Sequence, residues 1–120
     1  MLNLDTHILV HALQGTLKPR ERRLLAQDSW SISAIVLWEL TKLTQLKRIS
    51  IDLYSADFAI ALSRIHVWPL GLRVCQEVLK LDFRGDPADE IIAATSIVHQ
   101  APLLTRDGAI LKSKLVPFVK

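Results

Sequence analysis

The chain has 120 residues, of which 50% are hydrophobic, and a formal net charge of +3 at pH 7. This length suits one domain with a single core, spanning residues 1–120, and is too short for two domains. No stretch approaches the roughly 18 uninterrupted apolar residues of a membrane-spanning helix. The first residues also lack the cationic region and cleavage site of a secretory signal. We therefore expect a cytoplasmic protein that does not enter the membrane.

Cysteine usage and charge exclude some kinds of site. Cys75 is the only cysteine, which excludes an internal disulfide and a cysteine-based zinc cluster, and we expect its thiol to be buried and inert. The basic residues are clustered, which suits an anionic partner, but charge alone favours ordinary solvated helix faces. The clustered cations are Lys18, Arg20, Arg22, Arg23, Lys42, Lys47, Arg48, Arg106, Lys112 and Lys114.

Short apolar segments alternate with segments of helical pattern along the chain. In chain order we predict a strand at 2–4, helices at 6–14 and 20–27, a strand at 30–32, helices at 34–47 and 52–64, a strand at 66–68, helices at 71–81 and 87–99, a strand at 103–104, a helix at 108–112 and a strand at 116–119. Short apolar strands alternating with helices are typical of a parallel sheet covered on both faces. The predicted fold class is therefore α/β, with a short central parallel sheet of about five strands between helices.

Four acidic residues lie inside or beside apolar segments, where an unpaired carboxylate is costly. They are Asp5, Glu39, Asp89 and Asp107. Asp5 and Asp107 follow predicted strands, and functional groups of open parallel sheets gather beyond the carboxyl ends of the strands. Acids in such places need a cation or a proton, so this pattern predicts a metal site.

Helical wheels distinguish inward-facing acids from capping acids. Glu39 shares its side of the predicted helix with apolar residues and therefore faces inward. The alternative is a buried glutamate satisfied by an arginine or by backbone donors. Asp86 is placed to cap the helix that begins at Pro87. Asp89 lies in a helix that is apolar nearly all round, so we expect it to point into a cleft.

Converging carboxylates repel one another unless a cation neutralises them. An all-oxygen site suits Mg²⁺ or Mn²⁺, and Mg²⁺ typically takes one or two direct carboxylates while the other acids act through water. Such an ion lowers the pKa of a bound water and orients it toward a phosphodiester. Ser33 and Thr105 are candidates for hydrogen bonds to these waters.

At these residues the sequence resembles the PIN-domain nucleases, in particular the small VapC-type ribonuclease toxins of prokaryotic toxin–antitoxin pairs. The resemblance spans the whole chain and depends on four motifs in order: Leu2-Asn3-Leu4-Asp5-Thr6, Ile32-Ser33-Ala34-Ile35 through Trp38-Glu39-Leu40, Asp86-Pro87-Ala88-Asp89-Glu90-Ile91-Ile92-Ala93-Ala94-Thr95, and Leu103-Leu104-Thr105-Arg106-Asp107. Each motif alone is weak, but four in this order are specific. One departure is Glu90, where many relatives carry a basic or neutral residue.

The resemblance implies a PIN-like fold and a metal-dependent endoribonuclease. It implies that the four acids bind Mg²⁺ or Mn²⁺ and are catalytic, that Thr6, Ser33 and Thr105 assist them, and that Arg106 is a candidate for substrate binding. It further implies a homodimer and a small VapB-like antitoxin that inserts a segment near the acids. The rival function is a catalytically idle PIN-fold protein that binds RNA or an antitoxin without cleavage.

Other kinds of site lack their sequence signatures. His7 and His11 have a spacing that can hold zinc, but no glutamate stands at the metalloprotease position and no third ligand is evident. The chain has no Gly-x-Ser-x-Gly elbow and no glycine-rich phosphate loop. Tryptophans can stack on bases, yet apolar neighbours favour core packing for Trp30 and Trp38 and leave Trp68 undecided.

Overall fold

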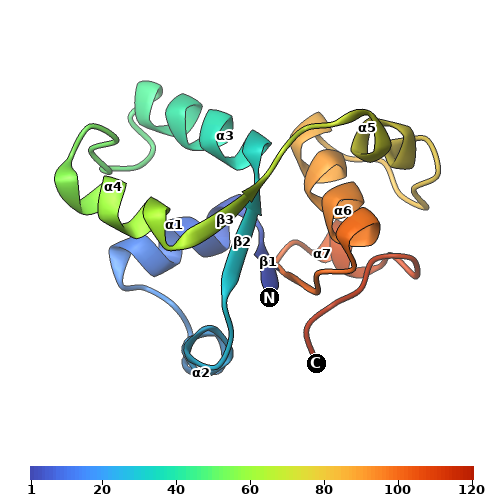
Figure 1. The fold of residues 1–120 in the computed structure, drawn as a ribbon, viewed down its shortest axis with the longest axis horizontal. Coiled ribbons are helices and arrows are strands. Elements are labelled where there is room, and N and C mark those ends of the chain that lie inside the picture. Colours follow the sequence, from blue (N-terminus) through green and yellow to red (C-terminus); the bar gives the residue numbers. More distant parts are fainter.

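The computed structural model describes residues 1–120, and its centre is a four-stranded parallel sheet (Figure 1). The strands are β1 (Leu2–Leu4), β2 (Trp30–Ser33), β3 (Ile65–Trp68) and β4 (Leu103–Leu104), in the order β3-β2-β1-β4. β1 is fully buried, and Asn3 is in register with Ser31 of β2 and with Leu103 of β4. Because every pairing is parallel, the carboxyl ends of all strands lie at one end of the sheet.

Helices cover both faces of this sheet, as the sequence predicted. They are α1 (Thr6–Gln14), α2 (Pro19–Ala26), α3 (Ala34–Gln45), α4 (Ala56–Ser63), α5 (Leu72–Val78), α6 (Pro87–His99) and α7 (Gly108–Leu111). Figure 1 shows α1, α3 and α4 on one side of the strands and α5, α6 and α7 on the other. No helix is both long enough and apolar enough to cross a membrane.

Polar side chains begin several of the helices next to strand ends. Asp5 caps α1, Ser33 caps α3 and Asp107 caps α7, each accepting a backbone N–H of the helix that follows. Gly15 ends α1 in the left-handed conformation, with φ 74°. Asp86 occupies the N-cap position of α6, but its side chain makes no capping hydrogen bond. The predicted capping role of Asp86 is therefore correct in position only.

The core between sheet and helices also contains one buried amide that ties β1 to α6. Asn3 is fully buried, and its Nδ2 donates to Ser96 Oγ at 2.8 Å and to the Ile92 carbonyl at 3.3 Å. A buried amide is tolerated only when it is hydrogen-bonded. These bonds fix the two elements that carry Asp5 and Asp89 relative to each other.

Two element predictions need correction. The segment 116–119 forms a single bridge, Leu103 to Phe118, in place of a strand, so the sheet has four strands. Pro117 contributes to this, because proline has no N–H for a sheet ladder. The helix predicted at 52–64 begins only at Ala56, because Ser55 accepts from Phe58 N at 3.1 Å and caps it there.

Two predictions of burial are also wrong. Trp38 is 58% exposed, because it lies two positions from both Val36 and Leu40, the residues by which α3 enters the core. Cys75 is exposed, since α5 buries only Val74. Trp30, in contrast, is half-buried, packs against the core and donates from Nε1 to the Leu25 carbonyl at 2.8 Å.

Candidate functional site

The four acids predicted from the sequence come from separate elements and lie near one another at the carboxyl end of the sheet. Asp5 follows β1, Asp107 follows β4, Glu39 lies in α3 and Asp89 lies in the first turn of α6. Burial is the largest cause of the raised pKa of Asp89. The negative charges of Asp5, Asp107 and Glu39 raise this pKa further. The fold thus brings all four carboxyl groups into one electrostatic cluster.

Asp5 is the most deeply buried member of this cluster, with 3% of its surface exposed. Its Oδ1 accepts from Thr6 N at 2.7 Å, and its Oδ2 accepts from Thr105 Oγ1 at 2.6 Å. Burial raises the pKa of Asp5, although these two hydrogen bonds oppose the rise. Both carboxylate oxygens are therefore held in fixed directions, each with a lone pair remaining.

Glu39 is half-buried and faces the same cluster from α3. Thr6 Oγ1 donates a short hydrogen bond to Glu39 Oε1. Burial raises the pKa of Glu39, and the charge of Asp5 adds to the rise. Of the residues predicted to assist, Thr6 and Thr105 thus each bond to an acid, whereas Ser33 caps α3 by accepting from the Ile35 N–H at 3.3 Å.

Asp89 differs from the other acids because its carboxylate makes no hydrogen bond to the protein. It is half-buried, and burial together with the charges of Asp5, Asp107, Glu39 and Asp86 raises its pKa to about 6. Asp107 lies between Asp5 and Asp89 in this respect, because only one of its carboxylate oxygens is hydrogen-bonded. Its Oδ1 accepts from Ala109 N at 2.9 Å and from Ile110 N at 3.2 Å. Asp89 is therefore the member that gains most from a cation, because nothing in the protein compensates its charge.

The donor set fits a hard divalent cation in its chemistry, since it consists of carboxylate and hydroxyl oxygens. The structure holds no group of three or more His, Cys, Asp or Glu side chains placed to share one ion. Mg²⁺ usually takes only one or two carboxylates directly and meets other groups through water, so it does not require three of these side chains to converge. The residues fit the metal predicted from the sequence on these terms.

A sequence model of the PIN domain matches residues 3–113. The chain belongs to the PIN domain family. No protein of curated function matches it in sequence.

Solved structures of other proteins share the fold of this PIN domain. A toxin–antitoxin complex from Klebsiella pneumoniae is similar with a TM-score of 0.72 and 19% identity, over 93% of this chain and 91% of that chain. VapBC2 from Rickettsia felis, bound to a DNA fragment from its promoter, is similar with a TM-score of 0.72 and 21% identity, over 99% of this chain and 98% of that chain. FitAcB from Neisseria gonorrhoeae is similar with a TM-score of 0.68 and 22% identity, over 99% of this chain and 97% of that chain.

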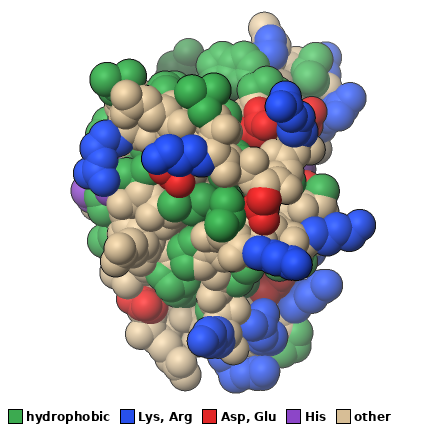
Figure 2. Space-filling model, turned by 90° about the vertical axis from the view of Figure 1, so that its right-hand side faces the viewer, with side chains coloured by type: hydrophobic (Ala, Val, Ile, Leu, Met, Phe, Trp, Pro, Cys, Tyr) green, Lys and Arg blue, Asp and Glu red, His purple; other side chains and the backbone are tan.

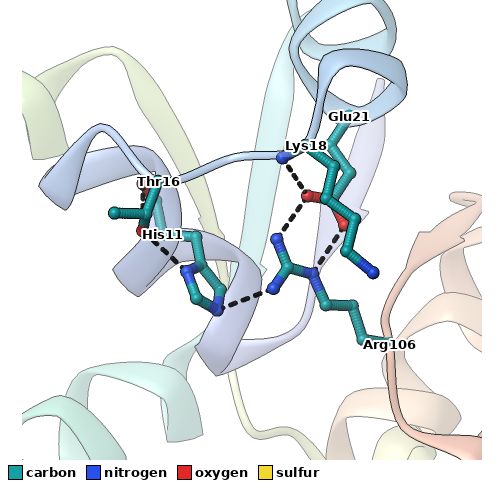
Figure 3. A network of polar contacts seen from close by, with 5 residues as sticks. All are labelled: His11, Thr16, Lys18, Glu21 and Arg106. Atoms are coloured by element: carbon teal, nitrogen blue, oxygen red, sulfur yellow. Dashed lines mark hydrogen bonds and ion pairs between the residues drawn. The ribbon is translucent and has the colours of Figure 1, made fainter.

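Arg106 of this PIN domain does not contact the acids but turns toward α1 and α2 (Figure 3). Its Nε donates to Glu21 Oε2 at 2.8 Å and its Nη2 to Glu21 Oε1 at 2.6 Å, while Nη1 lies 3.0 Å from His11 Nε2. The hydrogen bonds from Arg106 hold the pKa of Glu21 down at about 2. Two donor atoms of the predicted substrate-binding residue are therefore already engaged by Glu21.

Glu21 is the functional candidate that sequence reasoning missed. It is 5% exposed, although it lies in a strongly basic helix between Arg20 and Arg22. A signal was available, because Leu24 and Leu25 stand three and four residues later and share its face of the helix. A helical wheel of α2 would have placed this carboxylate inward, like Glu39.

A cavity of about 480 Å³ lies beside α3, next to the acid cluster. It is lined by Ile35, Trp38, Glu39, Asp86, Pro87 and Ala88. The cavity therefore opens onto one acid of the cluster and onto the exposed ring of Trp38. It is large enough for a nucleobase or a short side chain, so the site of this PIN domain is accessible from outside.

Proposed function

We propose that this PIN domain is a metal-dependent endoribonuclease whose active site is formed by Asp5, Glu39, Asp89 and Asp107. The observation that carries the proposal is the state of Asp89: a half-buried carboxylate with no hydrogen bond, near four like charges, with its pKa raised to about 6. Such a group lowers the stability of the folded protein, so its presence indicates a functional role. A bound divalent cation would offset the desolvation of the Asp89 carboxylate and its repulsion by the other carboxylates.

The chain's own residues supply binding and orientation in this site. Asp5 and Asp89 are the acids best placed to hold Mg²⁺ or Mn²⁺, with Glu39 and Asp107 acting directly or through water. When bound, the ion would activate a water and neutralise charge on the phosphodiester. Thr105 and the Thr6 N–H fix the directions of the Asp5 oxygens, and the Thr6 hydroxyl fixes Glu39. Their hydrogen bonds keep the oxygens in place before substrate arrives.

Charge on the outer surface supports an anionic polymer as the substrate. Figure 2 shows Lys and Arg side chains distributed over the face formed by α5, α6 and α7, with apolar surface between them. The exposed cations along these elements and their loops include Lys80, Arg84, Lys112 and Lys114. Cations on a face attract phosphates at long range, whereas Arg106, which the sequence predicted to bind substrate, is already engaged by Glu21 and His11.

We further propose that the protein is the toxin of a VapC-type toxin–antitoxin pair. Support comes from the shared fold, since one similar structure is a toxin–antitoxin complex and another is VapBC2 bound to promoter DNA. The partners would then be RNA in the cytoplasm, a small VapB-like antitoxin and a second copy of the chain. Co-expression with the reading frame next to its gene, followed by purification of a complex, tests the antitoxin directly.

A second function remains in view because no three acids are placed to share one ion. In that case the chain would be a catalytically idle PIN-fold protein that binds RNA or an antitoxin. The two functions differ in one measurement, since an idle protein shifts RNA in a gel but never shortens it. Long incubation with Mn²⁺ separates them.

The deciding experiment is cleavage of end-labelled total RNA by the purified protein in Mn²⁺, with and without chelator. Asp89→Asn is run in parallel, and Asp57→Asn, which changes an exposed acid on α4, is the matched control. Bands that need metal, persist in Asp57→Asn and vanish in Asp89→Asn establish the nuclease. Intact RNA in every lane, with binding retained, establishes the idle protein.

A further inference from the structure

Glu21 holds Arg106 with a geometry that few surface ion pairs have. Both carboxylate oxygens accept from the guanidinium, and Oε1 also accepts from Lys18 N at 2.8 Å. Glu21 thereby satisfies the N–H of the N-cap residue Lys18 at the start of α2 and is 5% exposed. Paired forks of this kind fix direction as well as distance. Arg106 is thus anchored to the first turn of α2.

His11 closes the remaining side of the guanidinium. Because a guanidinium can only donate, His11 Nε2 accepts from Arg106 Nη1 at 3.0 Å. Nδ1 then carries the ring proton and donates to Thr16 Oγ1 at 2.7 Å. Figure 3 shows the resulting chain of contacts from α1 through Arg106 to α2. Arg106 is therefore held from two helices at once.

Arg106 stands between two residues that belong to the acid cluster. Along extended backbone, successive side chains point to opposite sides, and Asp107 has extended dihedral angles of φ −72° and ψ 115°. Thr105 points to Asp5, and its Oγ1 also accepts from Asp107 N at 3.0 Å. Fixing Arg106 toward α2 therefore fixes its two neighbours toward the acids.

We propose that Glu21 is a positioning residue of this nuclease, which acts through Arg106 to hold Thr105 and Asp107 in the acid cluster. The inference deepens the proposed function and rests on it for any effect on metal or cleavage. The positioning role can be tested without that function, because it predicts that residues 105–107 loosen when the pair of Glu21 and Arg106 is broken. Glu21 makes no hydrogen bond to any of the four acids of the cluster.

The test is Glu21→Gln, which keeps the shape of the side chain and removes its charge. Glu77→Gln is the matched control, because Glu77 lies on α5 and forms no ion pair. Hydrogen exchange of backbone amides is measured on the metal-free proteins, followed by the Kd for Mn²⁺ from calorimetry and by kcat and KM for RNA. Arg106→Lys, which keeps the charge but cannot form the fork, serves if Glu21→Gln does not fold.

We expect the Asp107 amide to exchange at least about tenfold faster in Glu21→Gln, while the Asp5 amide, bonded to the Leu104 carbonyl at 3.1 Å, stays protected. The Kd for Mn²⁺ should rise roughly tenfold and kcat should fall, with KM little changed, as is usual when support of a ligand is lost. In a double-mutant cycle, adding Arg106→Lys to Glu21→Gln should have little further effect.

Two results would overturn the inference. One is unchanged exchange at Asp107 together with an unchanged Kd for Mn²⁺. The other is equal acceleration of all core amides with metal affinity intact, which would mean that the pair only stabilises the fold. If the wild type binds no Mn²⁺, the proposed function fails by itself, and faster exchange confined to residues 105–107 still supports the positioning role of Glu21.

Discussion

Thr105 donates its hydroxyl hydrogen to Asp5 across the junction of β4 and β1, with 2.6 Å between Oγ1 and Oδ2. The two residues are 100 positions apart in the chain, and parallel pairing of β1 with β4 brings them together. The same hydroxyl accepts from Asp107 N. One threonine therefore links the first and last acids of the candidate site.

Replacing Thr105 by Val should destabilise the protein, because a buried carboxylate oxygen would lose a hydrogen-bond donor. The expected loss is about 1–3 kcal/mol of unfolding free energy, whereas Thr105→Ser, which keeps the hydroxyl, should lose less than half of that. Urea unfolding at neutral pH measures both. An unchanged stability of Thr105→Val, with a loss only in Thr105→Ser, would show that the methyl group, and not the hydroxyl, carries the effect.

Asp89→Asn should make the metal-free protein as stable as the wild type or more stable, since it removes one of several repelling charges. Mn²⁺ should raise the unfolding free energy of the wild type by roughly 2.7 kcal/mol at a hundredfold excess over Kd, and raise that of the variant far less. Thermal unfolding with Mn²⁺ and with chelator tests this, with Asp57→Asn as control. Identical shifts in all three proteins would argue against a metal at this site.

Acid should weaken the pair of Glu21 and Arg106. The pKa of Glu21 is about 2 in the folded protein against an ordinary value of 4.5, so the unfolded chain binds the proton more readily. The stabilisation, on the order of 3 kcal/mol at most, is complete above pH 4.5 and is lost as the pH falls toward 2. Unfolding midpoints of the wild type and Glu21→Gln should therefore converge in acid, and a constant difference between them would contradict this account.

Two residues of α3 should respond oppositely to truncation. Leu40 is fully buried and Trp38 is 58% exposed. Leu40→Ala should cost about 2–5 kcal/mol through lost burial and the cavity it leaves. Trp38→Ala should cost less than about 1 kcal/mol. Denaturant unfolding compares the two, and a large loss for Trp38→Ala would show that its ring is covered in solution.

The sequence by itself determined most of the helices and strands and the motifs that carry the acids, because these depend on local signals. Periodicity, helix caps such as Ser33 and the stop at Gly15 act over a few residues. The rule that functional groups gather at the carboxyl ends of parallel strands then placed Asp5 and Asp107 at the same end of the sheet. The helical wheel turned Glu39 inward for the same local reason.

Only the tertiary structure decided which side chains on partly buried helices meet a partner. Glu21 and Arg106 are 85 residues apart, and no local pattern links them. Trp38 and Cys75 are exposed because α3 and α5 each bury one narrow face, and the width of that face depends on what packs against the helix. Long-range packing, which local sequence does not encode, determines these contacts and exposures. The predicted final strand is a different case, because Pro117, which has no N–H for a ladder, contributes to its reduction to a single bridge.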